Sequence, residues 1–140
     1  SGSLWEGRFR SSLVQTEQHL LGCYRYIEMD PVRANMVKHP IEYPWSSFAA
    51  NATGKRTEGI APHAEYLALG SDEEKRPTAY RGLFRTDLDP ELLREIRTST
   101  HGGYAIGNER FREEIEQAHQ RRATPRGPGR PASKIAISRQ

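Results

Sequence analysis

The chain has 140 residues, which is enough for one ordinary domain or for two small units that each bury little. Apolar residues make up only 35% of it and charged residues 28%, so the core must be small or part of the chain must stay solvated. No apolar run approaches the roughly 18 residues of a membrane-spanning helix. The first ten residues do not read as a signal peptide. The single cysteine, Cys23, excludes an internal disulfide and a multi-cysteine zinc site, so we expect a protein of the reducing cytoplasm.

The net charge of +3 is unevenly distributed along the chain. Residues 121–140 contain six basic residues and no acidic one, which leaves residues 1–120 with a net charge of −3. This segment is rich in Pro, Gly and Arg, and we expect it to be disordered. Residues 125–131 approximate an AT-hook, although non-specific contact with DNA phosphates is the stronger expectation. The residues expected to bind DNA are Arg121, Arg122, Arg126, Arg130 and Lys134. The alternative is a solvated tail that binds nothing.

The first predicted helix runs from Thr16 to Met29. Thr16 is a suitable N-cap, and one apolar face contains Leu20, Cys23, Tyr24 and Ile27 at helical spacing. Pro31 lies just past the end of this helix and favours a second short helix over residues 32–37.

The remainder is predicted to be a loop-rich stretch followed by helices. Trp45 and Phe48 are expected to pack a turn onto the preceding helices. Further helices are predicted near 63–69 and after residue 71. The clearest pair lies within residues 87–120, with Asp89 capping the first helix and Asn108 the second. This pair is a candidate helix-turn-helix, although most helical hairpins are structural.

Tyr26 is the residue with the most informative position. At about 100° per residue, Tyr26 falls at the edge of the predicted apolar face. Gly22, one turn earlier, leaves open space beside it, and Asp30 lies one turn later, within reach of the same face. A tyrosine oxygen can attack a DNA phosphorus and hold the cleaved end covalently. By spacing alone, a boundary tyrosine with a wet hydroxyl is the commoner interpretation.

Three segments resemble, in chain order, the REP-associated tyrosine transposases, which belong to the single-strand transposases with a His-hydrophobic-His metal motif. They are 4–10 (Leu-Trp-Glu-Gly-Arg-Phe-Arg), 24–34 (Tyr-Arg-Tyr-Ile-Glu-Met-Asp-Pro-Val-Arg-Ala) and 43–48 (Tyr-Pro-Trp-Ser-Ser-Phe). The resemblance continues more loosely through 107–111 and 129–131. It implies that Tyr26 is the nucleophile of a protein that cleaves and rejoins single-stranded DNA at hairpins of palindromic repeats. It also implies that Asp30, where the family has Asn or Gln, is the third ligand of a Mg²⁺ or Mn²⁺ ion.

The family's His-x-His pair is absent, because the five histidines of this chain lie far apart in sequence. We therefore expect a mainly α chain: the helical carboxy-terminal part of an α+β single-strand tyrosine transposase, without its sheet and His-x-His half. Residues 1–50 would complete the catalytic domain, 51–120 would form a helical accessory region with the possible helix-turn-helix, and 121–140 a basic tail. We expect such a chain to bind no metal and to cleave no DNA alone, while its parent acts in the bacterial cytoplasm near the nucleoid. The alternatives are a non-catalytic DNA-binding helical module and a helical protein-interaction domain.

Overall fold

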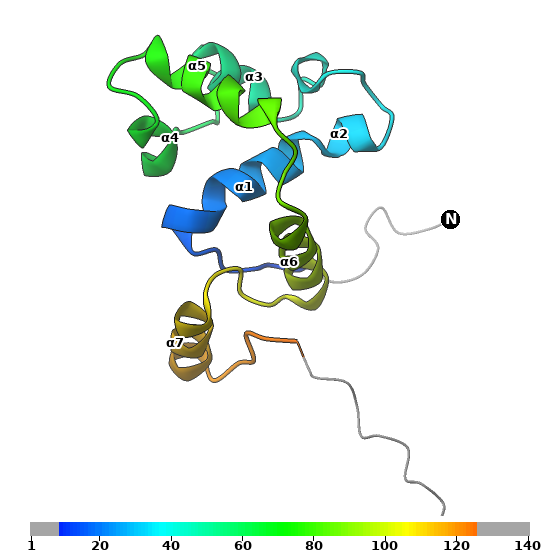
Figure 1. Ribbon diagram of the computed structural model, residues 1–140, viewed down its shortest axis with the longest axis vertical. Coiled ribbons are helices and arrows are strands. Elements are labelled where there is room, and N and C mark those ends of the chain that lie inside the picture. The colour runs from blue at the N-terminus through cyan, green and yellow to red at the C-terminus, as the bar shows by residue number, and fades with distance from the viewer. Residues whose placement is uncertain (1–8, 126–140) are drawn as a thin grey trace, which may run out of the picture.

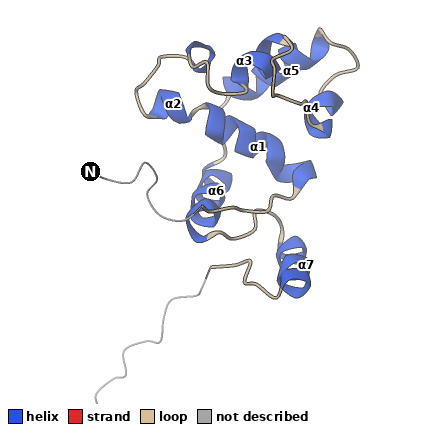
Figure 2. Ribbon diagram, turned by 180° about the vertical axis from the view of Figure 1, so that it is seen from behind, coloured by secondary structure: helices blue, strands red, loops and turns tan. Residues whose placement is uncertain are grey.

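The computed structural model describes residues 9–125, apart from the side chains of Glu17 and Gln18. Over this range the chain is mainly helical, as predicted, and forms no strand (Figure 2). A single parallel bridge joins Val14 to Ile106. The α-helices are α1 (Thr16–Glu28), α2 (Asp30–Arg33), α3 (Phe48–Thr53), α4 (Ala64–Ala68), α5 (Lys75–Gly82), α6 (Pro90–Gly102) and α7 (Glu109–His119). Two short 3₁₀ helices, η1 (Pro40–Glu42) and η2 (Leu83–Arg85), complete the described helices.

Helix α1 lies at the centre of the fold, between α3, α4 and α5 on one side and α6 on the other (Figure 1). Two hydrophobic clusters flank it. Leu21 and Tyr24 pack against the first cluster, which contains Phe48, Ala52, Tyr66 and Tyr80. Tyr26 packs against the second cluster, which contains Cys23, Ile96 and Ile106. A helix packed on two sides cannot have the single apolar face that the sequence predicted.

The predicted apolar face of α1 was therefore wrong in part. Ile27 is 59% exposed, whereas its neighbour Glu28 is fully buried. The helix also begins differently from the prediction, because the N-cap is Gln15 rather than Thr16. The Gln15 carboxamide does not cap α1. Its oxygen accepts a hydrogen bond of 2.9 Å from the backbone N–H of Asn108, which ties the start of α1 to the start of α7.

The buried Glu28 carboxylate joins the end of α1 to α3 and α5. Its Oε1 accepts hydrogen bonds from Ser47 Oγ at 2.6 Å and Asn51 Nδ2 at 3.2 Å, and its Oε2 accepts one from Tyr80 Oη at 2.6 Å. Burial raises the pKa of Glu28, and these three hydrogen bonds partly oppose that rise. A buried carboxylate is tolerated only when its oxygens have such partners, so this network ties the end of α1 to α3 and α5.

Of Trp45 and Phe48, which were both predicted to pack onto the preceding helices, only Phe48 does so. Phe48 is buried and lies edge-on to the ring of Phe84, with centroids 4.9 Å apart. Trp45, expected to pack beside it, is 84% exposed. The turn that precedes α3 directs Phe48 inward and leaves Trp45 in solvent.

Helices α6 and α7 begin at the predicted caps. The Asp89 carboxylate accepts from Glu91 N at 2.8 Å, and the Asn108 side-chain oxygen accepts from Phe111 N at 2.9 Å. Helix α2 begins at Asp30, close to the predicted start at Pro31, but it ends at Arg33 instead of reaching residue 37. Asn35 follows it with a left-handed φ of 56°. These ends are set by local chemistry, which is why the caps of α6 and α7 were predictable.

The connection between α6 and α7 is an extended segment rather than a tight turn. Ile106 N donates to Leu13 O at 2.7 Å, and Ala105 N donates to Ala123 O at 3.1 Å, so residues 105 and 106 lie between two other segments. Gly103 ends α6 with a φ of 67°. The turn of a DNA-reading helix-turn-helix has about three to four residues, and this longer connection differs from it. The helix pair at 87–120 is confirmed, while its DNA-reading role stays a prediction.

Candidate active site

Tyr26 lies near the end of α1, on the side that faces α6. The residue is partly buried and packs, together with Leu88 and Leu92, against the second hydrophobic cluster. Tyr24, two residues earlier, lies on the opposite side of α1 and packs against the aromatic cluster. The two tyrosines of this helix therefore have different surroundings.

Arg33 covers the Tyr26 ring. Its guanidinium carbon lies 4.3 Å from the ring centroid, within the range of a cation–π contact. Its Nη2 donates to the backbone carbonyl of Tyr26 at 2.7 Å and also forms an ion pair with the Asp30 carboxylate. Helix α2 follows α1 almost without interruption, so residues 26, 30 and 33 come together on one side of the α1–α2 junction.

Sequence reasoning placed Asp30 beside Tyr26 but gave Arg33 no role. The spacing of seven residues from Tyr26 is about two helical turns, which would have pointed to Arg33 had the helix been expected to continue past Pro31. A guanidinium at this position offers several N–H donors to an oxyanion, and it carries a positive charge at any accessible pH.

The space expected beside Gly22 is occupied. A Cβ at Gly22 would lie 2.6 Å from Cδ2 of Leu92, so the Leu92 side chain of α6 packs against this glycine. The absence of a side chain at residue 22 therefore permits helix packing instead of leaving a cavity in front of Tyr26. This corrects the sequence-based interpretation of Gly22.

A second polar group lies where α1, α6 and α7 meet. Glu95 Oε1 accepts from Arg112 Nη2 at 2.5 Å and from Gly107 N at 2.9 Å, and its Oε2 lies 3.9 Å from His19 Nε2. Nearby, burial and then the Glu95 charge raise the pKa of the Cys23 thiol to about 11. Such a thiol is not a nucleophile at neutral pH, and the Glu95 carboxylate is engaged by the groups around it.

The described residues do not form a site that could hold a divalent cation by themselves. Between residues 9 and 125, no three His, Cys, Asp or Glu side chains are grouped as metal ligands. Asp30 is the one predicted ligand among them, and its carboxylate is paired with Arg33. A hard cation such as Mg²⁺ needs several oxygen ligands, so Asp30 would have to be joined by ligands from outside the described range.

The structure places two of the five residues predicted to bind DNA. Arg121 and Arg122 are both exposed, and the Arg121 guanidinium lies beside Gly103, at the C-terminal end of α6. The charge of Arg122 helps to lower the pKa of Glu116, after larger contributions from hydrogen bonds to that carboxylate. Arg126, Arg130 and Lys134 lie outside the described residues, as does the AT-hook-like segment from residue 126 onward.

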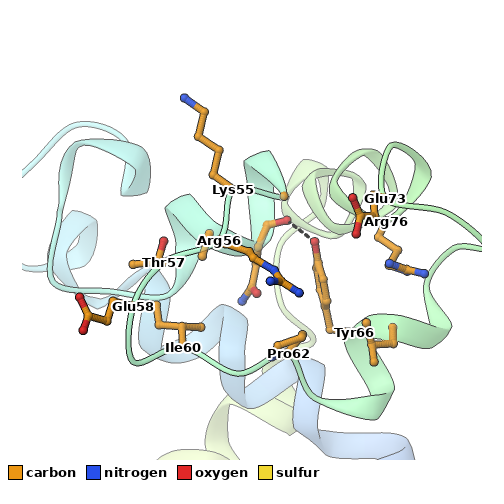
Figure 3. Close-up of a pocket in the computed structure, with 13 residues that line it drawn as sticks. Lys55, Arg56, Thr57, Glu58, Ile60, Pro62, Tyr66, Glu73 and Arg76 are labelled. Carbon is orange, nitrogen blue, oxygen red and sulfur yellow. Dashed lines mark hydrogen bonds between the residues drawn. The ribbon is translucent and has the colours of Figure 1, made fainter.

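A cavity lies away from Tyr26, among the loop after α3, α4 and α5. It has a volume of about 550 Å³, and its lining includes Arg56, Ile60, Tyr66 and Arg76. Figure 3 shows Arg56 extending toward Tyr66, whose hydroxyl donates to Asn51 O at 2.9 Å. This volume is within the range of small-molecule sites. Neither Tyr26 nor Asp30 lines it, so this cavity and the predicted nucleophile lie in different parts of the fold.

No protein-family model, curated protein or solved structure matches this chain. Within residues 9–125, no helix combines the length and the apolar composition needed to cross a membrane.

Proposed function

We propose that this chain is the nucleophile-bearing part of a transposase that cleaves and rejoins single-stranded DNA at repeat hairpins. The three ordered sequence segments support this proposal, and Tyr26 is its nucleophile. The observation that carries it furthest is the Arg33 guanidinium held over the Tyr26 ring by its contact with Asp30. A phenol that attacks a phosphodiester needs a cation close by, because negative charge develops on the phosphate oxygens.

The chemistry follows from this arrangement. The Tyr26 oxygen attacks the phosphorus, loses its proton to solvent, and forms a Tyr–O–P bond. The P–O3′ bond breaks, and the departing 3′ oxygen takes up a proton. The 5′ phosphate remains on Tyr26 as an ester, so a later 3′ hydroxyl can displace the tyrosine and rejoin the strand.

Arg33 is the group of this chain that would contact the phosphate. Charge-assisted hydrogen bonds from a guanidinium to a phosphate are short and directional. Asp30 sets the position of Arg33 through their ion pair. Divalent metal chemistry belongs to the parent protein in this proposal, because Asp30 alone cannot form the site. The chain by itself is therefore proposed to be inactive, and its parent to act in the bacterial cytoplasm near the nucleoid.

The test uses the full-length protein that contains this chain and a labelled single-stranded hairpin. Tyr26→Phe is expected to abolish both cleavage and the covalent protein–DNA adduct while hairpin binding is retained. Tyr24→Phe is the matched control, because it removes the same hydroxyl two residues away and should still cleave. Arg33→Gln should slow cleavage more than it weakens binding. A Tyr26→Phe protein that still cleaves would refute the assignment.

The second candidate is a non-catalytic DNA-binding helical module. The α6–α7 helix pair and the basic residues that follow it favour this function. Electrophoretic shifts on single-stranded and duplex DNA, with and without residues 121–140, distinguish the two candidates. A module of this kind would bind duplex DNA at least as well as a hairpin, and no Tyr26 adduct would form.

A further inference from the structure

Three segments far apart in the sequence meet at the C-terminal end of α6. Arg10 Nη1 donates to the carbonyl of His101 at 2.5 Å, and Ser12 Oγ donates to the carbonyl of Ser99 at 3.0 Å. These two bonds hold residues 9–12 against the end of the helix. Arg121, which follows α7 in the chain, lies at the same end of α6: its Nη2 is 3.3 Å from where a Cβ would stand on Gly103. We call this the α6-end surface and define it by Phe9, Arg10, His101 and Arg121.

The α6-end surface is hollowed and basic. It encloses a cavity of about 410 Å³, and no acidic residue lines it. None of the ion pairs among residues 9–125 involves Arg10 or Arg121. Part of the Arg10 charge faces the last carbonyls of α6, where a cation is favoured. The Arg121 guanidinium has no carboxylate partner among the described residues, so its charge can attract a polyanion.

Phe9 gives this surface an aromatic ring that the fold does not bury. The residue is 90% exposed, although a phenylalanine ring is among the side chains most often found inside proteins. A single exposed apolar residue needs no explanation, but Phe9 lines the same hollow as two arginines and a histidine. Aromatic rings next to cationic grooves are what proteins use to bind single-stranded nucleic acid, because a base stacks on the ring while arginines hold the phosphates.

We propose that the α6-end surface binds single-stranded DNA, with one base stacked on Phe9 and the adjoining phosphates held by Arg10 and Arg121. The identity of the polymer as DNA rests on the proposed function. The preference for a single strand is independent of it, because bases inside a duplex are already stacked and cannot offer a face to Phe9. Arg121 is also the first residue of the basic segment 121–140, so a bound strand would have further basic residues next to it in the sequence.

The test is fluorescence anisotropy of the full chain with a labelled 20-nucleotide oligo(dT) and with a mixed-sequence duplex of equal length. Phe9→Ala removes one base–aromatic stack, so it is expected to weaken oligo(dT) binding about tenfold and to leave duplex binding unchanged. Arg121→Gln should weaken oligo(dT) binding several-fold and flatten its salt dependence by about 0.7 in log–log slope. Phe9→Trp should restore binding, which excludes unfolding as the cause of the loss.

Two matched controls come from elsewhere on the surface. Trp45→Ala removes another exposed aromatic ring, and Arg110→Gln removes an exposed arginine that is paired with Glu114. Both should change oligo(dT) binding less than twofold.

Several outcomes overturn the proposal. These are oligo(dT) binding by Phe9→Ala equal to that of the wild type, an equal loss on both DNA forms, or no binding of oligo(dT) by the wild-type chain in low salt. The Tyr26 experiment is separate: full-length Tyr26→Phe that fails to cleave, together with Phe9→Ala that binds normally, would refute this surface and leave the proposed function standing. If Phe9→Ala weakens binding while full-length Tyr26→Phe still cleaves, the α6-end surface stands and the proposed function is refuted.

Discussion

Removing the Tyr80 hydroxyl tests whether the Glu28 network holds the end of α1 in place. Tyr80 is fully buried, and its Oη donates to Glu28 Oε2 at 2.6 Å. Tyr80→Phe keeps the ring and its contacts with Phe48 and Phe84, so it leaves no large cavity. The main change is that one oxygen of a buried carboxylate loses its donor; a longer hydrogen bond of 3.5 Å from Asn51 Nδ2 to the Tyr80 hydroxyl is also lost.

The magnitude follows mainly from the lost donor to Glu28. Leaving a buried acceptor without its partner costs about 1–3 kcal/mol, with charged acceptors at the upper end. We expect Tyr80→Phe to lower the free energy of unfolding by about 2–3 kcal/mol at pH 8, where Glu28 is most ionised. The cost should be smaller at pH 5, because a protonated Glu28 carries less charge for the hydroxyl to stabilise.

Urea denaturation followed by circular dichroism measures both values. Tyr66→Phe is the matched control, since the Tyr66 hydroxyl is also a donor within the aromatic cluster but bonds the neutral carbonyl of Asn51 at 2.9 Å. Its expected cost is about 1 kcal/mol, with no dependence on pH over this range. If Tyr80→Phe costs no more than Tyr66→Phe at pH 8, the argument for a charged buried network is wrong.

Two further predictions concern α1 itself. Burial raises the pKa of Glu28 in the folded state, so the folded chain holds that proton more tightly than the unfolded chain does. The free energy of unfolding should therefore fall as pH rises from the unfolded-state pKa of about 4.3 through the raised pKa of the folded state. Glu28→Gln should remove this decline, so its urea midpoint relative to the wild type should rise between pH 5 and pH 8; a constant difference would contradict the pKa shift. Gly22→Ala should destabilise the chain by up to about 1 kcal/mol, because the strain of its Cβ against the end of the Leu92 side chain exceeds the gain in helix propensity. In a Leu92→Ala background, Gly22→Ala should instead stabilise the chain by about 0.5–1 kcal/mol through helix propensity. In the wild-type background, Gly82→Ala should give a similar gain, because a Cβ built on Gly82 has no neighbour within 4 Å. If Gly22→Ala has the same effect in both backgrounds, the clash with Leu92 does not decide its cost.

Features of the fold that depend on a few neighbouring residues were predictable from the sequence. The caps at Asp89 and Asn108 are formed by side chains that bond N–H groups two or three residues later. The helices they begin are amphipathic over three turns, so their periodicity was clear. In contrast, the fates of Ile27 and Glu28 depend on what packs against α1 from both sides. A helical wheel assumes one buried face and cannot include a second layer of helices.

The candidate site divides in the same way. The spacing of four residues predicted that Tyr26 and Asp30 lie close together on one helix. In the structure Asp30 begins α2 instead, and the two residues are linked through Arg33, which contacts both. The position of Arg33 depends on α2 continuing the direction of α1 past Pro31, which a proline argues against in sequence. At the α6-end surface, the sequence predicted Arg121 as a DNA contact. It could not predict that this residue meets positions 9–10 and 101, because these are far apart in the chain.

The surroundings of the two tyrosines favour Tyr26 over Tyr24 as the proposed nucleophile. Burial and then the nearby Glu28 charge raise the pKa of Tyr24, so an anionic oxygen is disfavoured on that side of α1. A phosphate approaching Tyr24 would also meet the aromatic cluster and a buried carboxylate. Tyr26 instead has the Arg33 guanidinium over its ring, and a phosphate there would meet a cation. Two residues of helix thus separate a tyrosine that serves packing from one whose surroundings suit phosphoryl chemistry, which is why Tyr24→Phe is the informative control for Tyr26→Phe.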